Sequence, residues 1–254
     1  MNIALTIAGS DPTGGAGLQA DLKVFRHFGV YGLSAVSALT AQNTTKVRAV
    51  SAVDPSFLEE QLKTLINDIR PDALKTGMLY TREAIRTVAR IVRGFDLQNL
   101  VIDPVTISST GAPLLEDGAL DVLKEELFPL AAVITPNIYE ASVLSGVRIE
   151  NETEMGEAAM ALRRLGPDTV IITGGHLENE TVELFYDGVS VHLFRGEKAE
   201  GEYHGTGCAF SAAVTALLAK GKSPLEALKK TKEFMDTAIK NAHILGKGMR
   251  LLDV

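Results

Sequence analysis

Apolar and polar positions change their spacing in a regular way along this chain of 254 residues. Short apolar, β-branched runs predict strands at Ile3–Ala8, Gly32–Ala38, Ala73–Thr76, Leu100–Ile102, Ala132–Thr135 and Val170–Thr173. Amphipathic stretches predict helices at Gly15–Phe28, Pro55–Asp68, Thr81–Arg93, Glu116–Phe128, Ile138–Ser145, Glu152–Leu165, Cys208–Lys220 and Pro224–Ala242. Strands and helices that alternate in this way are typical of βαβ units. We therefore expect an α/β fold with a mostly parallel central sheet and helices on both faces.

The spacing changes between Thr181 and His204. The stretch VELFYDGVSVHLFRGEK alternates apolar and polar residues around Asp187-Gly188, which predicts a β-hairpin. We therefore expect a few antiparallel strands at an edge of the sheet. Neither a linker nor an internal repeat interrupts the pattern, so we interpret residues 1–254 as a single domain.

Composition limits the classes of function that fit this chain. Hydrophobic residues make up 46% and charged residues 22%, as in a globular protein with a sizeable core. The net charge of −7, without a Lys/Arg cluster, argues against a nucleic-acid-binding surface. The N-terminus lacks the features of a signal peptide, and no apolar stretch in the sequence reaches the roughly 20 residues of a membrane span. A single cysteine fits a reducing, cytoplasmic location.

Polar and glycine-rich stretches follow the predicted strands, at the edge of the sheet where parallel α/β folds bind ligands. The first, AGSDPTGGAGLQAD, opens a helix and could bring backbone N–H groups to an anion. It matches the P-loop and dinucleotide patterns only in part, and a plain turn is the alternative. Asp21 could bind a hydroxyl group, and Gln42 offers a donor and an acceptor to a heteroaromatic ring. Solvent exposure and an ordinary turn are the simpler explanations for these two residues.

Acidic residues after two later strands suggest a metal site. Asp103 lies in the stretch IDPV at a strand end, where carboxylates commonly hold Mg²⁺ through water. Asn137 and Glu140 lie three residues apart at the start of a predicted helix, so both can face one site. Helix capping is a strong alternative for Asn137, but it does not explain Glu140 together with Asp103.

The only cysteine of the chain lies in the stretch YHGTGCAFS. Gly205, Thr206 and Gly207 precede a predicted helix that begins at Cys208, and their N–H groups could form an anion hole for a transferring phosphoryl group. The helix dipole should lower the pKa of a thiol at this position. A small buried cysteine that packs the helix is the alternative.

Taken together, these stretches resemble the hydroxymethylpyrimidine/phosphomethylpyrimidine kinases of thiamine biosynthesis, in the ribokinase-like superfamily. The resemblance covers essentially the whole chain. It rests on TIAGSDPTGGAGLQADLK, ALTAQNT, KTGML, DPV, TPNIYEA, GGH and HGTGCAFS. It implies a ribokinase-like fold and transfer of the ATP γ-phosphoryl group to a pyrimidine alcohol and then to its monophosphate. It also implies a cytoplasmic homodimer without nucleic-acid or membrane partners.

The resemblance also implies roles for individual residues. Those on the substrate side are Gly9, Asp21, Gln42, Met78 and Thr106, with Asp21 near the hydroxymethyl group, Gln42 on the ring edge and Met78 against the ring. Those on the ATP side are Asn137, Thr173 and Gly175. Asp103 and Glu140 would support Mg²⁺, and Gly205, Thr206 and Gly207 would form the anion hole. Cys208 would stand where most of the superfamily has an aspartate base.

The sequence departs from the family pattern at a few positions. Thr106 stands where methionine is usual, and Thr173 stands where lysine is common. The chain ends soon after LGKG, so we expect no fused thiamine-phosphate synthase module.

Three alternatives remain open at this point. A pyridoxine/pyridoxal kinase shares the fold, although Gln42, Met78 and the GSDPTGGAG stretch favour the pyrimidine. A thiol enzyme could perform acyl transfer with Cys208 and His204, but the glycine turn between them makes their alignment unfavourable. A non-catalytic vitamin-binding protein is the third alternative, suggested only by Thr173.

Overall fold

A mixed sheet forms the centre of the protein. The computed structural model describes residues 1–107, 111, 114–174 and 180–254, and within these residues nine strands pair in the order β3-β2-β1-β4-β5-β6-β7-β8-β9. Their bounds are β1 (Ile3–Ser10), β2 (Tyr31–Gln42), β3 (Val47–Ala52), β4 (Ala73–Thr76), β5 (Leu100–Ile102), β6 (Val133–Ile134), β7 (Thr169–Ile172), β8 (Glu180–Tyr186) and β9 (Val191–Glu197). The strands from β2 to β7 pair in parallel, whereas β3 at one edge and the β8–β9 hairpin at the other are antiparallel. The predicted α/β class and the antiparallel hairpin are confirmed.

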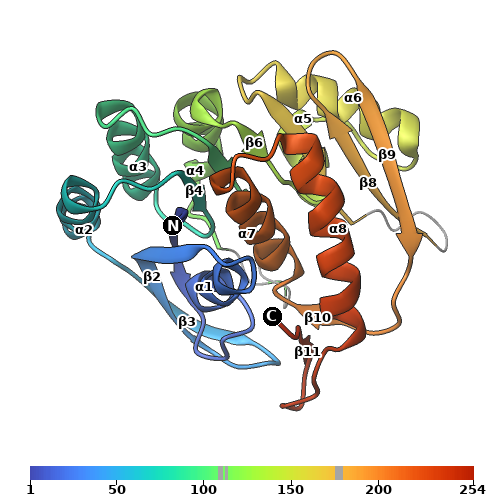
Figure 1. Ribbon diagram of the computed structural model, residues 1–254, viewed down its shortest axis with the longest axis horizontal. Helices are drawn as coiled ribbons and strands as arrows, with labels where there is room; N and C mark the ends of the chain where they lie inside the picture. The colour runs from blue at the N-terminus through green and yellow to red at the C-terminus, as the bar shows by residue number, and fades with distance from the viewer. Residues whose placement is uncertain (108–110, 112–113, 175–179) are drawn as a thin grey trace.

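Helices cover both faces of this sheet (Figure 1). One face packs against α1 (Gly17–His27), α7 (Thr206–Ala219) and α8 (Pro224–Lys240). The other packs against α2 (Pro55–Asp68), α3 (Arg82–Gly94), α4 (Ala119–Val122), α5 (Ile138–Ser145) and α6 (Glu152–Arg163). Successive strand residues serve opposite faces, since Ala4 joins the first core and Leu5 the second. Each large apolar side chain buried in this way contributes roughly 1.5–3 kcal/mol.

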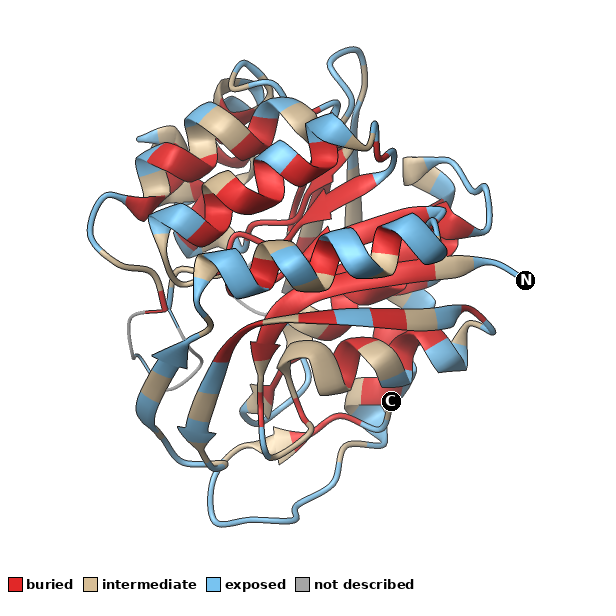
Figure 2. Cartoon of the chain, turned by 90° about the vertical axis from the view of Figure 1, so that its left-hand side faces the viewer, coloured by how far each residue is buried: buried red, intermediate tan, exposed pale blue. Residues whose placement is uncertain are grey.

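Burial follows this layered arrangement. The central strands and the inward faces of the helices are buried, and the outward faces of the helices are exposed (Figure 2). Because β1, β4, β5 and β6 run in parallel, the residues that follow them lie together at the carboxyl edge of the sheet. This edge carries the polar stretches that the sequence singled out.

Two elements differ from the sequence-based expectations. Strand β3 was not predicted, and all of its residues are exposed or only partly buried, so it has no apolar face to produce a pattern. The helix predicted over Glu116–Phe128 is broken into a short α-helix, a π-helical turn over Leu123–Leu127 and a 3₁₀ turn over Phe128–Leu130. Gly118, with φ of 76°, delays its start, and Pro129 lies in its last turn.

A second, two-stranded sheet ties the end of the chain to the start of α7. Strand β10 (Tyr203–His204) pairs in parallel with β11 (Arg250–Leu251). This pairing fixes His204 immediately before the glycine turn that opens α7.

A buried ion pair lies between the sheet and the helices α1 and α7. The Lys75 side chain projects from β4 and its Nζ donates to Asp21 Oδ1 on α1 at 2.7 Å, with both side chains fully buried. The other carboxylate oxygen of Asp21 accepts from Thr6 Oγ1 at 2.6 Å. Burial alone would lower the pKa of Lys75, but the Asp21 carboxylate raises it above its usual value. Lys75 therefore stays charged inside the protein.

Lys75→Met should destabilise the fold by about 3–5 kcal/mol, because it leaves the Asp21 carboxylate buried without its partner. The double variant Lys75→Met/Asp21→Asn should regain most of this loss, since asparagine removes the charge and keeps an acceptor for Thr6. Urea unfolding at pH 7 measures both effects. Equal losses in the single and double variants would show that the charge on Asp21 is not the cause.

Candidate active site

A cavity of about 440 Å³ opens at the carboxyl edge of the sheet. Twelve of the residues that the sequence singled out line it: Gly9, Gln42, Met78, Asp103, Thr106, Asn137, Glu140, Thr173, Gly205, Thr206, Gly207 and Cys208. Gly175 lies outside the described residues. The structure thus brings together groups from the first and last thirds of the chain.

Asp21 is the exception among the predicted site residues. It is not among the described residues that line the cavity, and its carboxylate is occupied by Lys75 and Thr6. The structure therefore places it beneath the site rather than in its wall. Its position in the sequence did not reveal this, because the partner Lys75 lies 54 residues away.

One wall of the cavity is apolar and tightly packed. Met78 is almost fully buried and forms a small cluster with Ala38 and Leu114. A Cβ atom added to Gly9 would lie 3.2 Å from Met78 Sδ, so the absence of a side chain at Gly9 leaves room for Met78. This arrangement offers a flat aromatic ligand a thioether contact.

Two buried carboxylates face the cavity on another side. Asp103 follows β5, and its Oδ2 accepts from Ser211 Oγ at 3.0 Å. Glu140 lies in the first turn of α5, where it forms a capping box with Asn137: Glu140 Oε2 accepts from the Asn137 N–H at 3.0 Å, and Asn137 Oδ1 accepts from the Glu140 N–H at 2.9 Å. Capping therefore explains Glu140 as well as Asn137, contrary to the sequence-based argument.

The capping box does not neutralise the charge of Glu140. Burial, with the nearby Asp103 carboxylate as the second cause, raises the pKa of Glu140 to about 8. Burial also raises the pKa of Asp103. Because burial disfavours the ionised forms of these two carboxyl groups, a cation bound between them would stabilise both charges.

The glycine turn before α7 has the geometry expected of an anion hole. Gly205 is the N-cap with φ of 79°, and the first intrahelical bond runs from the Ala209 N–H to the Gly205 carbonyl at 2.9 Å. The N–H groups of Thr206, Gly207 and Cys208 precede that bond and lie at the cavity. A Cβ atom on Gly207 would lie 3.9 Å from both Asp103 carboxylate oxygens, so this turn and that carboxylate face each other closely.

The environment of Cys208 differs from the sequence-based expectation in two ways. The helix begins at Thr206, which makes Cys208 its third residue rather than its first. Burial raises the pKa of the Cys208 thiol to about 12, with the Asp103 and Asp21 carboxylates adding to this effect and Lys75 opposing it. The predicted lowering by the helix dipole was therefore wrong, because desolvation of the thiolate outweighs it. The backbone of Gly17 lies near the thiol and slightly offsets this rise in pKa.

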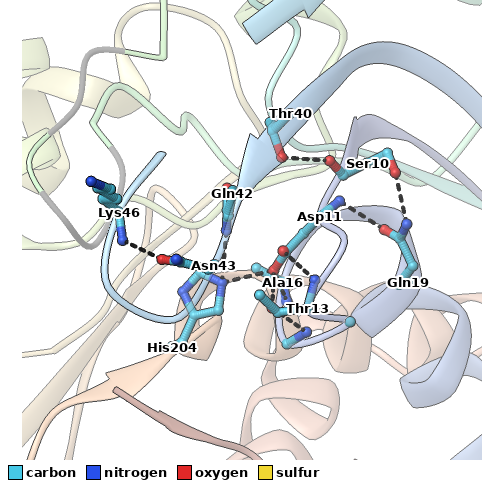
Figure 3. Close-up of polar contacts among 12 residues, drawn as sticks. Ser10, Asp11, Thr13, Ala16, Gln19, Thr40, Gln42, Asn43, Lys46 and His204 are labelled. Atoms are coloured by element: carbon cyan, nitrogen blue, oxygen red, sulfur yellow. Dashed lines mark hydrogen bonds and ion pairs between the residues drawn. The ribbon is translucent and has the colours of Figure 1, made fainter. Parts of the chain in front are cut away.

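A polar network that the sequence did not reveal lies beside Gln42 (Figure 3). Asp11, in the first glycine-rich stretch, accepts at 2.7 Å from His204 Nε2, and Gln42 Nε2 lies 3.0 Å from the same ring nitrogen. Asp11 and His204 are both buried, and all three residues line the cavity. Their separation in the sequence hid this network, although Asp11 and His204 each lie next to a glycine-rich stretch.

Comparison with known proteins agrees with this arrangement. Residues 11–253 match the family model described as phosphomethylpyrimidine kinase. The chain belongs to this family. The ribokinase-like architecture inferred from the sequence therefore holds for it.

Its relatives include enzymes with two kinds of substrate in their names. The thiamine biosynthesis bifunctional protein of Geobacter sulfurreducens is 44% identical over 96% of this chain and 50% of its own length. The hydroxymethylpyrimidine/phosphomethylpyrimidine kinase of Bacillus subtilis is 41% identical over 96% of this chain and 92% of its own length. The crystal structure of an ADP complex of Bacillus subtilis pyridoxal kinase is similar with a TM-score of 0.91 and 41% identity, covering 99% of this chain and 96% of that one. The chain spans about half the length of the two bifunctional relatives that it matches.

Raised carboxyl pKa values predict how the stability of the metal-free protein depends on pH. An unfolded glutamate releases its proton near the ordinary value of 4.5, whereas folded Glu140 keeps it until about pH 8. The contribution of Glu140 to the free energy of unfolding is thus fully present below pH 4.5 and is lost as the pH rises towards 8. In EDTA, the free energy of unfolding should fall by about 2–4 kcal/mol from pH 5 to pH 8.

Glu140→Gln should remove most of this pH dependence in urea unfolding. Glu154→Gln is the matched control, because Glu154 holds the same position after the Asn151 cap of α6 and is only partly buried. An unchanged slope in Glu140→Gln would assign the dependence to other groups.

The contact between the two glycine turns can be tested separately. A Cβ atom on Gly205 would lie only 1.8 Å from the Gly15 carbonyl oxygen. Gly146, the C-cap of α5, has nearly the same φ, 75°, but nothing lies within 4 Å of its Cβ position. Gly146→Ala should cost about 1–2 kcal/mol for the left-handed conformation alone. Gly205→Ala should lower the free energy of unfolding by at least ~2 kcal/mol more than Gly146→Ala does, because the new methyl group meets the Gly15 carbonyl. Urea unfolding measures both losses, and equal losses would contradict a close approach at Gly205.

Proposed function

We propose that this protein is an ATP- and Mg²⁺-dependent kinase that phosphorylates 4-amino-5-hydroxymethyl-2-methylpyrimidine and then its monophosphate, in thiamine biosynthesis. The observation that carries the proposal is the position of the α7 N-terminus, which aims backbone N–H groups into the same cavity that Asp103 and Glu140 face. Membership of the phosphomethylpyrimidine kinase family supports the same reaction. One domain spanning residues 1–254 would contain the complete site.

The backbone at the start of α7 would stabilise the transferring group. Phosphoryl transfer has a loose transition state with charge on its outer oxygens, so positioned donors contribute more than covalent chemistry. The N–H groups of Thr206, Gly207 and Cys208 would supply these donors, aided by the dipole of the 14-residue helix α7. Because these donors are fixed by the fold, they need no reorganisation during the reaction.

Two other groups of residues would hold the reactants. Gly9, Gln42 and Met78 would bind the pyrimidine, with Gln42 on its edge and Met78 against its face. Asn137 and Thr173, which are joined by an isolated parallel bridge, would lie on the nucleotide side. Thr106 also lines the cavity, and its buried hydroxyl has no protein partner among the described residues. Gly175 completes the predicted nucleotide side outside those residues.

The chemistry of the acidic pair fits Mg²⁺. Asp103 and Glu140 are hard oxygen donors in a buried site, and burial, with repulsion from Asp103 as the second cause, raises the pKa of Glu140. The described residues contain no group of three or more His, Cys, Asp or Glu side chains arranged for a metal, so phosphate oxygens and water would complete the ligand set. When bound, the ion would neutralise phosphate charge.

The high pKa of Cys208 favours a role as a hydrogen-bonding thiol in the free protein. With a pKa of about 12, its thiolate is a minor species near neutral pH. The thiol would hydrogen-bond the acceptor hydroxyl and so position it, whereas accepting the proton of that hydroxyl would first require the loss of the thiol proton.

The proposed reaction is tested by ATP consumption with Mg²⁺ and a panel of alcohols: hydroxymethylpyrimidine, its monophosphate, pyridoxine, pyridoxal and ribose. Turnover of both pyrimidine species is the expected result. Pyridoxine or pyridoxal kinase activity is the second candidate, favoured by the high similarity to the pyridoxal kinase fold. Turnover of the pyridine alcohols without the pyrimidines would overturn the proposed substrate while leaving the kinase assignment intact.

A cytoplasmic homodimer is the proposed state of the enzyme. No helix in the described part of the chain is both long and apolar enough to cross a bilayer. Leu39 on β2 and Phe57 on α2 are more than half exposed, which gives the β3 edge of the sheet an apolar surface for a second copy. Sedimentation equilibrium tests this state.

Cys208→Ala should lower kcat by roughly 10²-fold, as expected when the acceptor hydroxyl loses the group that positions it, with little change in the Kd for ATP. Cys208→Ser should retain more activity than Cys208→Ala, because a hydroxyl can make the same hydrogen bond. Steady-state kinetics and ATP titration measure these effects. A near-normal kcat in Cys208→Ala would show that the thiol has no catalytic role, which would leave the backbone N–H groups of the anion hole.

A further inference from the structure

The hydrogen bonds to Asp11 show that its carboxyl group is ionised in the buried network beside Gln42. The carboxylate of Asp11 accepts from two backbone N–H groups, Thr13 to Oδ1 and Ala16 to Oδ2, each at 2.9 Å. Its Oδ2 also accepts from the Thr13 hydroxyl at 2.8 Å. With donors on both oxygens, a carboxyl proton has no favourable place. Burial would raise the pKa of Asp11, but the bonds from His204 and Thr13 outweigh it and lower the pKa.

An ionised Asp11 determines which ring nitrogen of His204 carries a proton. His204 Nε2 lies 2.7 Å from Asp11 Oδ2, and a carboxylate can only accept. The Nε2 atom must therefore carry a hydrogen, whether the ring is neutral or cationic. The Nε2 lone pair is then used, so this nitrogen cannot accept a second hydrogen bond.

The side-chain amide of Gln42 meets the same nitrogen. Gln42 Nε2 lies 3.0 Å from His204 Nε2, and Figure 3 shows Gln42 and Asp11 converging on this one atom. An amide nitrogen is also a donor, so this orientation sets two donors against each other. The amide oxygen and nitrogen have nearly the same shape, so rotating the amide by half a turn keeps the packing and turns the contact into a shared hydrogen bond. The rotated amide should therefore be populated roughly tenfold or more over the unrotated one.

We propose that Asp11, acting through the Nε2–H of His204, orients Gln42 so that its amide oxygen faces His204 and its N–H groups point into the cavity. The site then selects a ligand that presents a hydrogen-bond acceptor, such as an unprotonated ring nitrogen, at this point. Asp11 and His204 are positioning residues for this selection, and Gln42 is the residue that contacts the ligand. The identity of the ligand as a pyrimidine rests on the proposed function, whereas the orientation of the amide does not.

The first test is the tautomer of His204 in the intact, ligand-free protein. Two-dimensional ¹⁵N NMR of the five histidine rings distinguishes protonated from unprotonated ring nitrogens, and loss of one spin system in His204→Gln assigns the ring. A protonated Nε2 at neutral pH is the expected result. An Nε2 without a proton would overturn the inference, and the result does not depend on which alcohol the enzyme phosphorylates.

The second test exchanges the donor for an acceptor. Gln42→Glu keeps the size of the side chain and an oxygen for His204 but presents a second oxygen to the ligand. KM for hydroxymethylpyrimidine should rise by at least tenfold, with a smaller change in kcat. A second comparison uses two analogues of the pyrimidine, each with one of its ring nitrogens replaced by C–H. With the wild type, one of these analogues should have a kcat/KM at least tenfold below that of the pyrimidine. With Gln42→Glu, the same analogue should show no such loss. An unchanged KM in Gln42→Glu would mean that an oxygen already faces the ligand and would overturn the inference.

Two further variants complete this design. Gln98→Glu, on an exposed turn outside the cavity, controls for the added charge and should behave as the wild type. Asp11→Asn should narrow the preference between the pyrimidine and its C–H analogue, because it removes the carboxylate that requires a proton on His204 Nε2 and so fixes the orientation of Gln42. A purely structural role for Asp11 predicts lower activity on both ligands with the preference unchanged, which would contradict the inference. Wild-type turnover of the pyrimidine tests the proposed function independently of these comparisons.

Discussion

A direct approach of two backbone segments holds the candidate site together. Gly15 and Gly205 are 190 positions apart, yet a single Cβ on Gly205 would overlap the Gly15 carbonyl. Because neither residue has a side chain, the loop after β1 and the turn before α7 touch directly. This contact brings the thiol of Cys208 near the backbone of Gly17 and His204 to Asp11. The anion hole and the polar network beside Gln42 therefore depend on the same pair of glycines.

Charge inside the site is arranged around this contact in two layers. Beneath the cavity, Lys75 and Asp21 compensate each other, and Lys75 Nζ also approaches the Cys208 carbonyl at 3.4 Å. Burial raises the pKa values of all three carboxyl groups, Asp21, Asp103 and Glu140, and Lys75 opposes this rise at Asp21 and Asp103. Asp21 thus has a direct ion-pair partner, whereas Asp103 and Glu140 have none among the described residues. This division gives the chemical reason for expecting Mg²⁺ at one pair of carboxyl groups and not at Asp21.

The sequence predicted the elements whose patterns arise from burial. The parallel strands of the core and the amphipathic helices follow from apolar spacing, as in Ala73–Thr76 and Pro55–Asp68, where expectation and structure coincide. Strand β3 lacks a buried face and produced no pattern. For the site, the rule that ligands bind at the carboxyl edge of a parallel sheet brought together most of the right residues. It did not separate Asp21 from the cavity, because burial of that carboxylate depends on Lys75, a partner distant in the sequence.

The same limit applies to chemistry that depends on how groups share protons. From sequence, Cys208 at a helix N-terminus suggests a reactive thiolate. In the fold, desolvation and two carboxylates reverse that conclusion. Gln42 presents the complementary case, since its residue type offers both a donor and an acceptor, and only its neighbours decide which one a ligand meets. Relatives of this chain whose names refer to pyrimidine and to pyridoxal kinases share its fold at about 40% identity, so the fold cannot make that choice. Single protons in the cavity wall decide which ligand atoms are matched there, and Asp11 is the buried charge that places one of these protons.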